Sequence, residues 1–218
     1  MKKIRIRNRL LLFVLVLALF VPSANVCALT QKQKAFNAYK SMLSKSKVSI
    51  VSSGSPTPSS KVQFAIAYID NNDVPELIVK RSDGLFAVFT YKNNKIYRVK
   101  KGNGYDKFVG YYKKTGGYKL FDSTGKEGSY YIYYNENYYL LTNSGTTQKI
   151  SKYVYLGPTD RNPRTPMYMD YTSYNKGHGV AINHSTFKSK FVSLTKGKSL
   201  TKVKYYSNTA ANRKKYLK

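Results

Sequence analysis

Hydrophobic and polar positions follow a helical period in the segment 29–51 and a strand period over most of the chain after it. Apolar residues of the first segment recur at helical spacing: Ala35, Phe36, Tyr39, Met42 and Leu43. Thr30 and Gln33 have the spacing of a capping box, in which each side chain accepts a hydrogen bond from the other residue's backbone. The pattern therefore predicts one N-terminal amphipathic helix, followed by a linker loop at 52–60 that is rich in Ser and Pro.

From residue 61 to residue 206, short runs rich in Val, Ile, Tyr and Phe alternate with turn residues. Asn93 and Asn94 separate two such runs and tolerate the positive φ that a two-residue hairpin loop requires. This spacing predicts an antiparallel β meander, with a propeller-like or curled sheet as an alternative form. The stretch 157–187 has no sustained period, so we expect an irregular insertion there. A short C-terminal helix or tail is predicted over 207–218, and the expected fold class is α+β, mainly β.

The segment 1–28 has the layout of a secretory signal peptide. "MKKIRIRNR" places five basic residues before an apolar run that is too short to span a bilayer. Small residues precede Ala28, after which cleavage fits best. An alternative makes Cys27 the lipid-bearing first residue of a lipoprotein, although the residues before it do not match that signal. Cleavage at Ala28 predicts a secreted or cell-surface protein that keeps no Cys and therefore forms no disulfide.

Basic residues dominate the chain, because 38 Lys and Arg stand against 10 Asp and Glu and give a formal net charge of +28. Removal of the leader would lower this charge to +23, since the leader carries five basic residues. A charge of this size indicates an anionic partner or surface. For an exported chain we expect anionic cell-wall polymers or glycans, no nucleic acid and no transmembrane segment after signal removal. A merely solubilising surface is the alternative.

Tyrosine is the second compositional feature, with 22 residues. Because successive strand residues face opposite sides of a sheet, we expect each Tyr doublet to place one ring outward or at an edge. Outward rings beside Lys would form a platform for sugar rings or anionic polymer. The candidate ligand-binding residues are Tyr111, Tyr112, Tyr130, Tyr131, Tyr133 and Tyr134. A low-complexity coat without a ligand is the alternative interpretation.

The stretch "FAIAYIDNNDVPELIV" departs from the basic composition around it. It resembles the loop D-x-D-G-D-G-x-P-E-L of small secreted or lipid-anchored proteins of Gram-positive gut bacteria, a loop similar to the calcium-binding loops of FG-GAP repeats. The resemblance implies calcium at Asp70, Asn72 and Glu76, because calcium takes six to eight oxygen ligands. Tyr68 replaces the first acidic ligand, and Asp73 replaces the Gly of the turn. The alternative, which we favour, is a turn closed by Asx side chains with no cofactor.

A second resemblance covers residues 110–128, "GYYKKTGGYKLFDSTGKEG", which look like one copy of a choline- and glucan-binding wall repeat. Those repeats hold a quaternary ammonium group by cation–π attraction to Trp and Tyr rings. This chain has no Trp and no further convincing copy. Because such sites form between adjacent repeats, we expect only a Tyr-rich hairpin here.

Residue sets that carry enzyme chemistry are sparse. The chain after the leader has no Cys for a thiol nucleophile or a Cys-based zinc site, and no G-x-S-x-G motif marks a serine hydrolase. His178 and His184 lack the one-turn spacing of a helical metal pair, although a zinc pair across a hairpin with Asp160 or Asp170 stays open. The favoured function is an exported, non-enzymatic binding protein, held at the cell envelope by anionic polymers or recognising glycans. The alternative is a secreted, glycosidase-like hydrolase that uses two of the scattered carboxylates.

Overall fold

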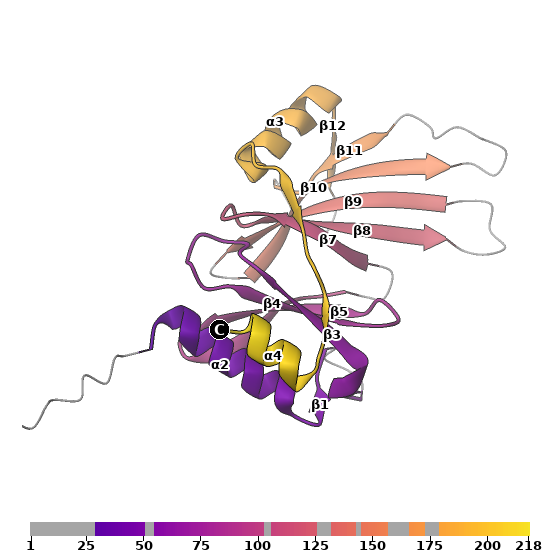
Figure 1. Cartoon of the computed structure of the whole chain (residues 1–218). Coiled ribbons are helices and arrows are strands. Elements are labelled where there is room, and N and C mark those ends of the chain that lie inside the picture. Colours follow the sequence, from indigo (N-terminus) through magenta and orange to yellow (C-terminus); the bar gives the residue numbers. More distant parts are fainter. Residues whose placement is uncertain are drawn as a thin grey trace, which may run out of the picture.

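The computed structural model describes most of the chain after residue 28, namely residues 29–50, 55–102, 106–125, 132–142, 145–156, 166–172 and 179–218. The predicted signal peptide and Cys27 lie outside the described residues. Two antiparallel sheets lie one above the other, with helices on their outer sides (Figure 1). The fold is α+β and mainly β, as the alternating pattern predicts. The strands form stacked sheets and not a propeller or a single curled sheet.

The first sheet has five strands in the order β14-β3-β4-β5-β6. Its strands are β3 (Val62–Ala67), β4 (Glu76–Arg81), β5 (Phe86–Lys92), β6 (Lys95–Lys101) and β14 (Tyr206–Ser207). Strands β3 to β6 form the predicted meander, whereas β14 returns from the C-terminal part of the chain to pair with β3. Asn93 and Asn94 form the β5–β6 turn with φ angles of 50° and 57°. The two-residue hairpin predicted at Asn93 and Asn94 is therefore confirmed, and it depends on the ability of Asn to adopt a positive φ.

The second sheet has seven strands in the order β12-β11-β10-β9-β8-β7-β13. Its strands are β7 (Asp106–Tyr112), β8 (Gly117–Gly125), β9 (Ile132–Thr142), β10 (Gly145–Leu156), β11 (Met167–Asp170), β12 (Val180–Ile182) and β13 (Leu200–Lys202). Consecutive strands from β7 to β12 pair in antiparallel fashion, and β13 closes the other edge by pairing with β7. A small separate ladder joins β1 (Lys47–Val48) to β2 (Thr57–Pro58).

Three α-helices of the described ranges cover the outer sides of the two sheets (Figure 1). Helices α2 (Gln31–Ser44) and α4 (Ala210–Tyr216) lie side by side on the five-stranded sheet, and α3 (His184–Thr195) lies on the seven-stranded sheet. Thr30 and Gln33 form a complete capping box at the start of α2. Thr209 caps α4 in the same way, by accepting a hydrogen bond from the Asn212 backbone N–H. None of the helices in the described ranges is long and apolar enough to cross a membrane.

Two segments differ from the predicted organisation. The range 52–60 was expected to be a linker loop, but it contains β2 and the start of the 3-10 helix η1 (Ser59–Lys61). Asn208 holds this segment against α2, because its side-chain amide donates to the backbone oxygens of Leu43 (2.8 Å) and Ser59 (3.0 Å). The range 157–187 was expected to be irregular, but it contains β11, β12 and the first turn of α3. Residues 157–165 and 173–178 of that range lie outside the described residues.

Three hydrophobic layers hold these elements together. The first lies between α2 and the five-stranded sheet, the second between the two sheets, and the third between the seven-stranded sheet and α3. Alternation along β4 shows the principle, since Leu77 and Val79 face the first layer while Ile78 faces the second. Both faces of each sheet are therefore buried along the central strands.

The Tyr111–Tyr112 doublet spans the seven-stranded sheet, with one ring on each face, and exposes neither ring. Tyr111 enters the layer between the sheets, and Tyr112 enters the layer beneath α3, where its ring packs edge-on against Phe191 at 5.7 Å between centroids. Tyr111 is 7% exposed and Tyr112 is 3% exposed. The prediction that these two residues form a ligand platform is wrong, because α3 covers the face that a bare meander would leave to solvent.

We expect Tyr111→Ala and Tyr112→Ala each to lower the free energy of unfolding by about 3 to 5 kcal/mol, as truncation of a buried aromatic ring does. Tyr97→Ala is the matched control, because the Tyr97 side chain is 43% exposed, and it should cost less than about 1 kcal/mol. Urea unfolding followed by circular dichroism measures all three variants. Small and equal effects at the three positions would contradict the burial of the doublet.

Candidate functional site

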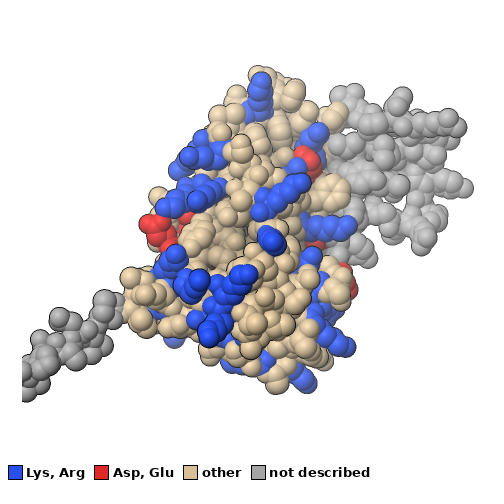
Figure 2. Space-filling model, in the orientation of Figure 1, with Lys and Arg blue, Asp and Glu red and all other residues tan. Residues whose placement is uncertain are grey.

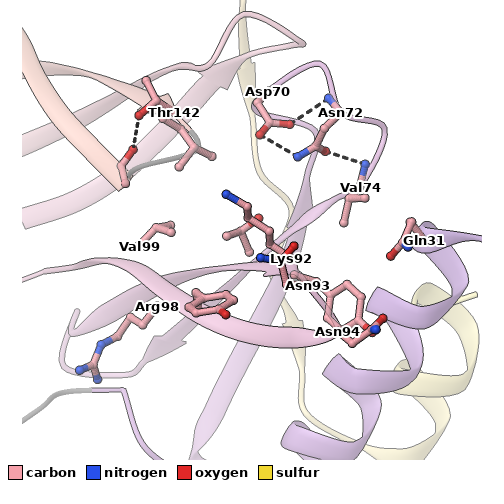
Figure 3. A pocket seen from close by; sticks show the side chains of 15 residues that line it. Gln31, Asp70, Asn72, Val74, Lys92, Asn93, Asn94, Arg98, Val99 and Thr142 are labelled. Atoms are coloured by element: carbon pink, nitrogen blue, oxygen red, sulfur yellow. Dashed lines mark hydrogen bonds between the residues drawn. The ribbon is translucent and has the colours of Figure 1, made fainter.

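An open cleft with a volume of about 980 Å³ lies where the ends of the two sheets meet the loop between β3 and β4 (Figure 3). One wall is the 70–74 turn of that loop, the second is the β5–β6 hairpin, and the third is the end of the β9–β10 hairpin. We call this space the hairpin cleft. Its polar and aromatic lining includes Asp70, Asn72, Lys92, Asn93, Tyr97 and Thr142.

The 70–74 turn is closed by its own side chains. The Asp70 carboxylate accepts the Asn72 backbone N–H (3.1 Å) on one oxygen and the Asn72 side-chain amide (2.9 Å) on the other. The Asn72 side-chain oxygen in turn accepts the Val74 N–H at 2.8 Å. Burial raises the pKa of Asp70, and the hydrogen bond from Asn72 opposes that shift. These contacts make the segment an Asx turn, which is the alternative that the sequence favours.

Glu76 lies at the base of the loop and is fully buried. One carboxyl oxygen accepts the Ile69 N–H at 2.9 Å, and Thr90 approaches the other at 3.5 Å. Burial raises the pKa of Glu76 to about 8, and the nearby charge of Asp70 adds to the rise. Tyr39 of α2 donates from its hydroxyl to the backbone oxygen of Pro75 at 2.9 Å. Glu76 therefore fixes the loop from beneath and does not line the hairpin cleft.

The three residues that the resemblance assigns to calcium come together only in part. Asp70 and Asn72 share the turn, but Glu76 faces inward to the Ile69 N–H. Asn72 directs an amide donor at the Asp70 carboxylate, and the Lys114 ammonium lies 2.5 Å from Asp73. These donors and this cation fit poorly to an ion that needs six to eight oxygen ligands. In the described ranges no three His, Cys, Asp or Glu side chains gather closely enough to hold a metal ion.

The other metal candidates are not assembled in the part of the chain that the structure describes. His178 and Asp160 lie outside the described residues. His184 begins α3 and stacks on Tyr168, with ring centroids 5.0 Å apart. Asp170 accepts hydrogen bonds from Thr172 and forms an ion pair with Lys190 at 3.0 Å.

The exposed tyrosine of the described ranges is Tyr97, which is not one of the six candidates that the doublet pattern predicts. Tyr130 and Tyr131 lie outside the described residues, and for Tyr133 and Tyr134 only their place in strand β9 is described. Tyr97 is the only exposed ring among the Phe and Tyr side chains that the structure describes, and it lines the hairpin cleft. The sequence gives one indication of this exposure. Tyr97 lies in "KIYRVKK", a segment with too many basic residues for a central strand, which is typical of a strand at the edge of a sheet.

Lysines cover several of the rings near the surface. The Lys80 ammonium lies 4.3 Å from the centroid of the Tyr205 ring, and that of Lys100 lies 4.3 Å from the Tyr139 ring. Burial lowers the pKa of Lys100, while the negative charge of Asp106 acts in the opposite direction. Because these cation–π contacts place an ammonium group over each ring, the faces of the Tyr205 and Tyr139 rings are not open to a ligand.

The surface is strongly biased toward positive charge. Four acidic side chains of the described residues are engaged in ion pairs: Asp73 with Lys114, Asp83 with Arg81, Glu136 with Lys119 and Asp170 with Lys190. Helices α2, α3 and α4 contain no acidic residue. Their basic residues are Lys32, Lys34, Lys40, Lys188, Lys190, Arg213, Lys214 and Lys215. Figure 2 shows Lys and Arg spread over the visible face with few acidic residues between them.

Comparison of the chain with protein-family models, curated proteins and solved structures gives no match. The function is therefore inferred from the site itself. Asp70 is the only carboxylate among the described residues that line the hairpin cleft. A glycosidase needs two carboxyl groups on either side of the scissile bond, and the described lining of this cleft supplies one.

We expect Glu76→Gln to remove a pH dependence of stability. Burial raises the pKa of Glu76 from 4.5 to about 8, so between these values the folded chain holds a proton that the unfolded chain releases. The free energy of unfolding should therefore fall as the pH rises from about 4.5 to about 8. The variant keeps an acceptor for Ile69 and should be more stable than the parent at pH 9 by roughly 2 to 4 kcal/mol.

Urea unfolding at several pH values measures this effect. Asp83→Asn is the control. Arg81 holds the pKa of Asp83 below its usual value, so the ionised Asp83 carboxylate stabilises the fold and this stability is lost as the pH falls, which is opposite to the effect of Glu76. A Glu76→Gln profile parallel to that of the parent protein between about pH 5 and pH 9 would show that Glu76 is not the buried acid responsible.

Calcium should have little effect on stability, because the Asp70–Asn72 turn already uses its oxygens. We expect about 5 mM CaCl₂ to move the Tm by less than about 1 °C relative to the same concentration of MgCl₂. Thermal unfolding followed by circular dichroism is sufficient. An upshift of several degrees that is specific for calcium and absent in Asp70→Asn would instead support the calcium loop that the resemblance implies.

Proposed function

We propose that this is an exported, non-enzymatic binding protein that anionic polymers retain at the cell envelope. The observation that carries the proposal is the arrangement of charge: the helices on both outer sides of the sheets contain basic residues and no acidic ones. The segment 1–28, with its basic start and short apolar run, supports export. Wall polymers that carry phosphate are then the anionic partners within reach.

The magnitude of the charge favours a partner over simple solubility. A net charge of about 2 to 8 with mixed signs is enough to keep a small domain soluble. The chain carries +28, or +23 without its leader, and self-repulsion at this level opposes the compact state. A polyanion removes that repulsion when it binds. Part of the binding free energy then comes from relief of repulsion within the protein.

The arrangement of the lysines suits a flexible polymer. Exposed ammonium groups on α4, such as Lys214 and Lys215, sit on long side chains that reach successive phosphates without a fixed geometry. Each phosphate that they neutralise releases condensed counterions, so the affinity gains from entropy at low salt. Binding of this kind needs no pocket, and it must weaken as salt is added.

We expect the protein to sediment with purified cell-wall sacculi only while teichoic acid is present, and less as salt rises. Replacement of three lysines on the α4 side (Lys214→Gln, Lys215→Gln and Lys218→Gln) should lower the slope of log affinity against log salt by about 2 to 3. The matched control alters three uncharged positions on the same side: Asn37→Ala, Ser41→Ala and Ala211→Ser. Circular dichroism verifies that both triple variants are folded.

Two results would contradict the proposal. One is equal binding to sacculi from which teichoic acid has been removed, because the phosphate polymer would then be unnecessary. The other is binding that persists at about 1 M NaCl, where the screening length is only about 3 Å.

A further inference from the structure

We propose that the hairpin cleft is a carbohydrate site that binds a short oligosaccharide segment, with one sugar ring packed on Tyr97. This site is separate from the basic helical surfaces and does not rest on their function. The inference is carried by three features: a preformed polar cleft, side-chain amides at its rim, and the position of the exposed ring inside it.

The hairpin cleft is braced from both sheets. The Thr146 hydroxyl of β10 donates to the Val99 backbone oxygen of β6 at 2.9 Å, which joins the seven-stranded sheet to the five-stranded sheet at the cleft. The backbone N–H groups of Thr115 and Gly116 both donate to the Ile69 oxygen, at 3.0 and 2.8 Å. These contacts fix the 70–74 turn to the β7–β8 hairpin. A ligand therefore meets walls that are already in place, and little ordering free energy is lost on binding.

The rim offers groups that match sugar hydroxyls. A hydroxyl both donates and accepts, and so does a side-chain amide. Asn93 and Asn94 form the tip of the β5–β6 hairpin at the cleft (Figure 3). The Asn72 amide on the facing wall, in contrast, is engaged with Asp70 and Val74. A two-residue turn with positive φ is formed most easily with Gly in it. This turn uses two Asn residues instead, and it therefore keeps two amide side chains at the mouth of the cleft.

Tyr97 supplies the apolar surface that a sugar needs. The faces of sugar rings carry C–H groups that pack against aromatic rings, and the Tyr hydroxyl stays in contact with water. Every other Phe or Tyr side chain that the structure describes is buried or partly buried. The exposed Tyr97 ring lines the hairpin cleft, whose apolar lining also includes Val99 and Leu141.

The charges of the cleft narrow the class of ligand. Lys92 reaches into the space between the 70–74 turn, Thr142 and Val99 (Figure 3). Arg98 also lines the cleft, and Asp70 lies on the opposite wall, so the lining carries two cations and one carboxylate. A polyanion with a charge on every unit would place one of those charges beside Asp70, whereas a single acidic group can pair with Lys92 and avoid Asp70. We therefore expect an oligosaccharide that is neutral or has a single acidic substituent, and not the phosphate polymer of the helical surfaces.

The test is binding to a panel of immobilised oligosaccharides of about two to four sugars, at about 0.5 M NaCl to suppress charge-driven contacts. The panel contains β-1,4-linked N-acetylglucosamine oligomers, galactose-containing neutral oligomers and uronic acid oligomers. We expect at least one class to bind. Tyr97→Ala should weaken that binding by about tenfold or more, whereas Tyr97→Phe should retain it because the stacking face remains.

Two further variants make the test specific. Asn93→Gly keeps the turn, because glycine accepts a φ of 50°, but it removes one amide and should weaken binding several-fold. Met167→Ala alters an apolar side chain that is 53% exposed and outside the cleft lining, and it should leave binding unchanged. Absence of binding to all three classes, or equal binding by Tyr97→Ala and the parent protein, would overturn the inference. Sugar binding that survives the three Lys→Gln changes would separate this site from the polyanion surface.

Discussion

Burial of both faces of both sheets is the constraint on which the rest of this structure depends. A sheet that is covered on two sides needs apolar residues at successive strand positions, and β4 meets that need with Leu77, Ile78 and Val79. The outer faces then require helices, which α2, α4 and α3 provide. Tyr is suited to such layers because the ring packs inside while the hydroxyl can reach a polar partner at the edge, as Tyr39 does at Pro75.

This constraint also determines what is left for the surface. Most tyrosines whose side chains the structure describes pack in or against the three layers, so in these ranges the feature that most suggested a binding platform is structural. Lysines cannot enter those layers, and they occupy the helices, the sheet edges and the space above rings such as Tyr205 and Tyr139. Acidic residues are few, and several are taken up by ion pairs or by the base of the 70–74 loop. A surface of nearly one sign results, and we propose that its partner is a polyanion.

The sequence carries the local features of the fold and not the distant ones. The helical period and the capping box of Thr30 and Gln33 are sufficient to place α2, and Asn93 and Asn94 identify their hairpin. The pairing of β14 with β3 cannot be read from local pattern, because about 140 residues separate the strands. Helix α3 has Phe187, Phe191 and Leu194 at helical spacing, but its start lies in a stretch with Pro that suggested an irregular loop. Without α3, the doublet at Tyr111 and Tyr112 looks half exposed.

In the candidate site, too, the local features could be predicted from the sequence and the long-range ones could not. The residues of the 70–74 turn were evident from sequence, and so was the choice between calcium and an Asx turn. The hairpin cleft was not, because its walls come from three hairpins in two sheets. Tyr97 could not be singled out among 22 tyrosines until the other tyrosine side chains in the described ranges were seen to be buried or partly buried.

The most direct test of this account is the rate at which individual tyrosines are nitrated by tetranitromethane in the native protein, followed residue by residue with mass spectrometry. We expect Tyr97 to react first among the tyrosines in the described ranges, while Tyr111, Tyr112 and Tyr118 stay unmodified until the protein unfolds. Nitration of Tyr111 or Tyr112 as fast as Tyr97 would contradict the two-sided burial of the sheets. It would return the tyrosine doublets to the surface as the binding platform.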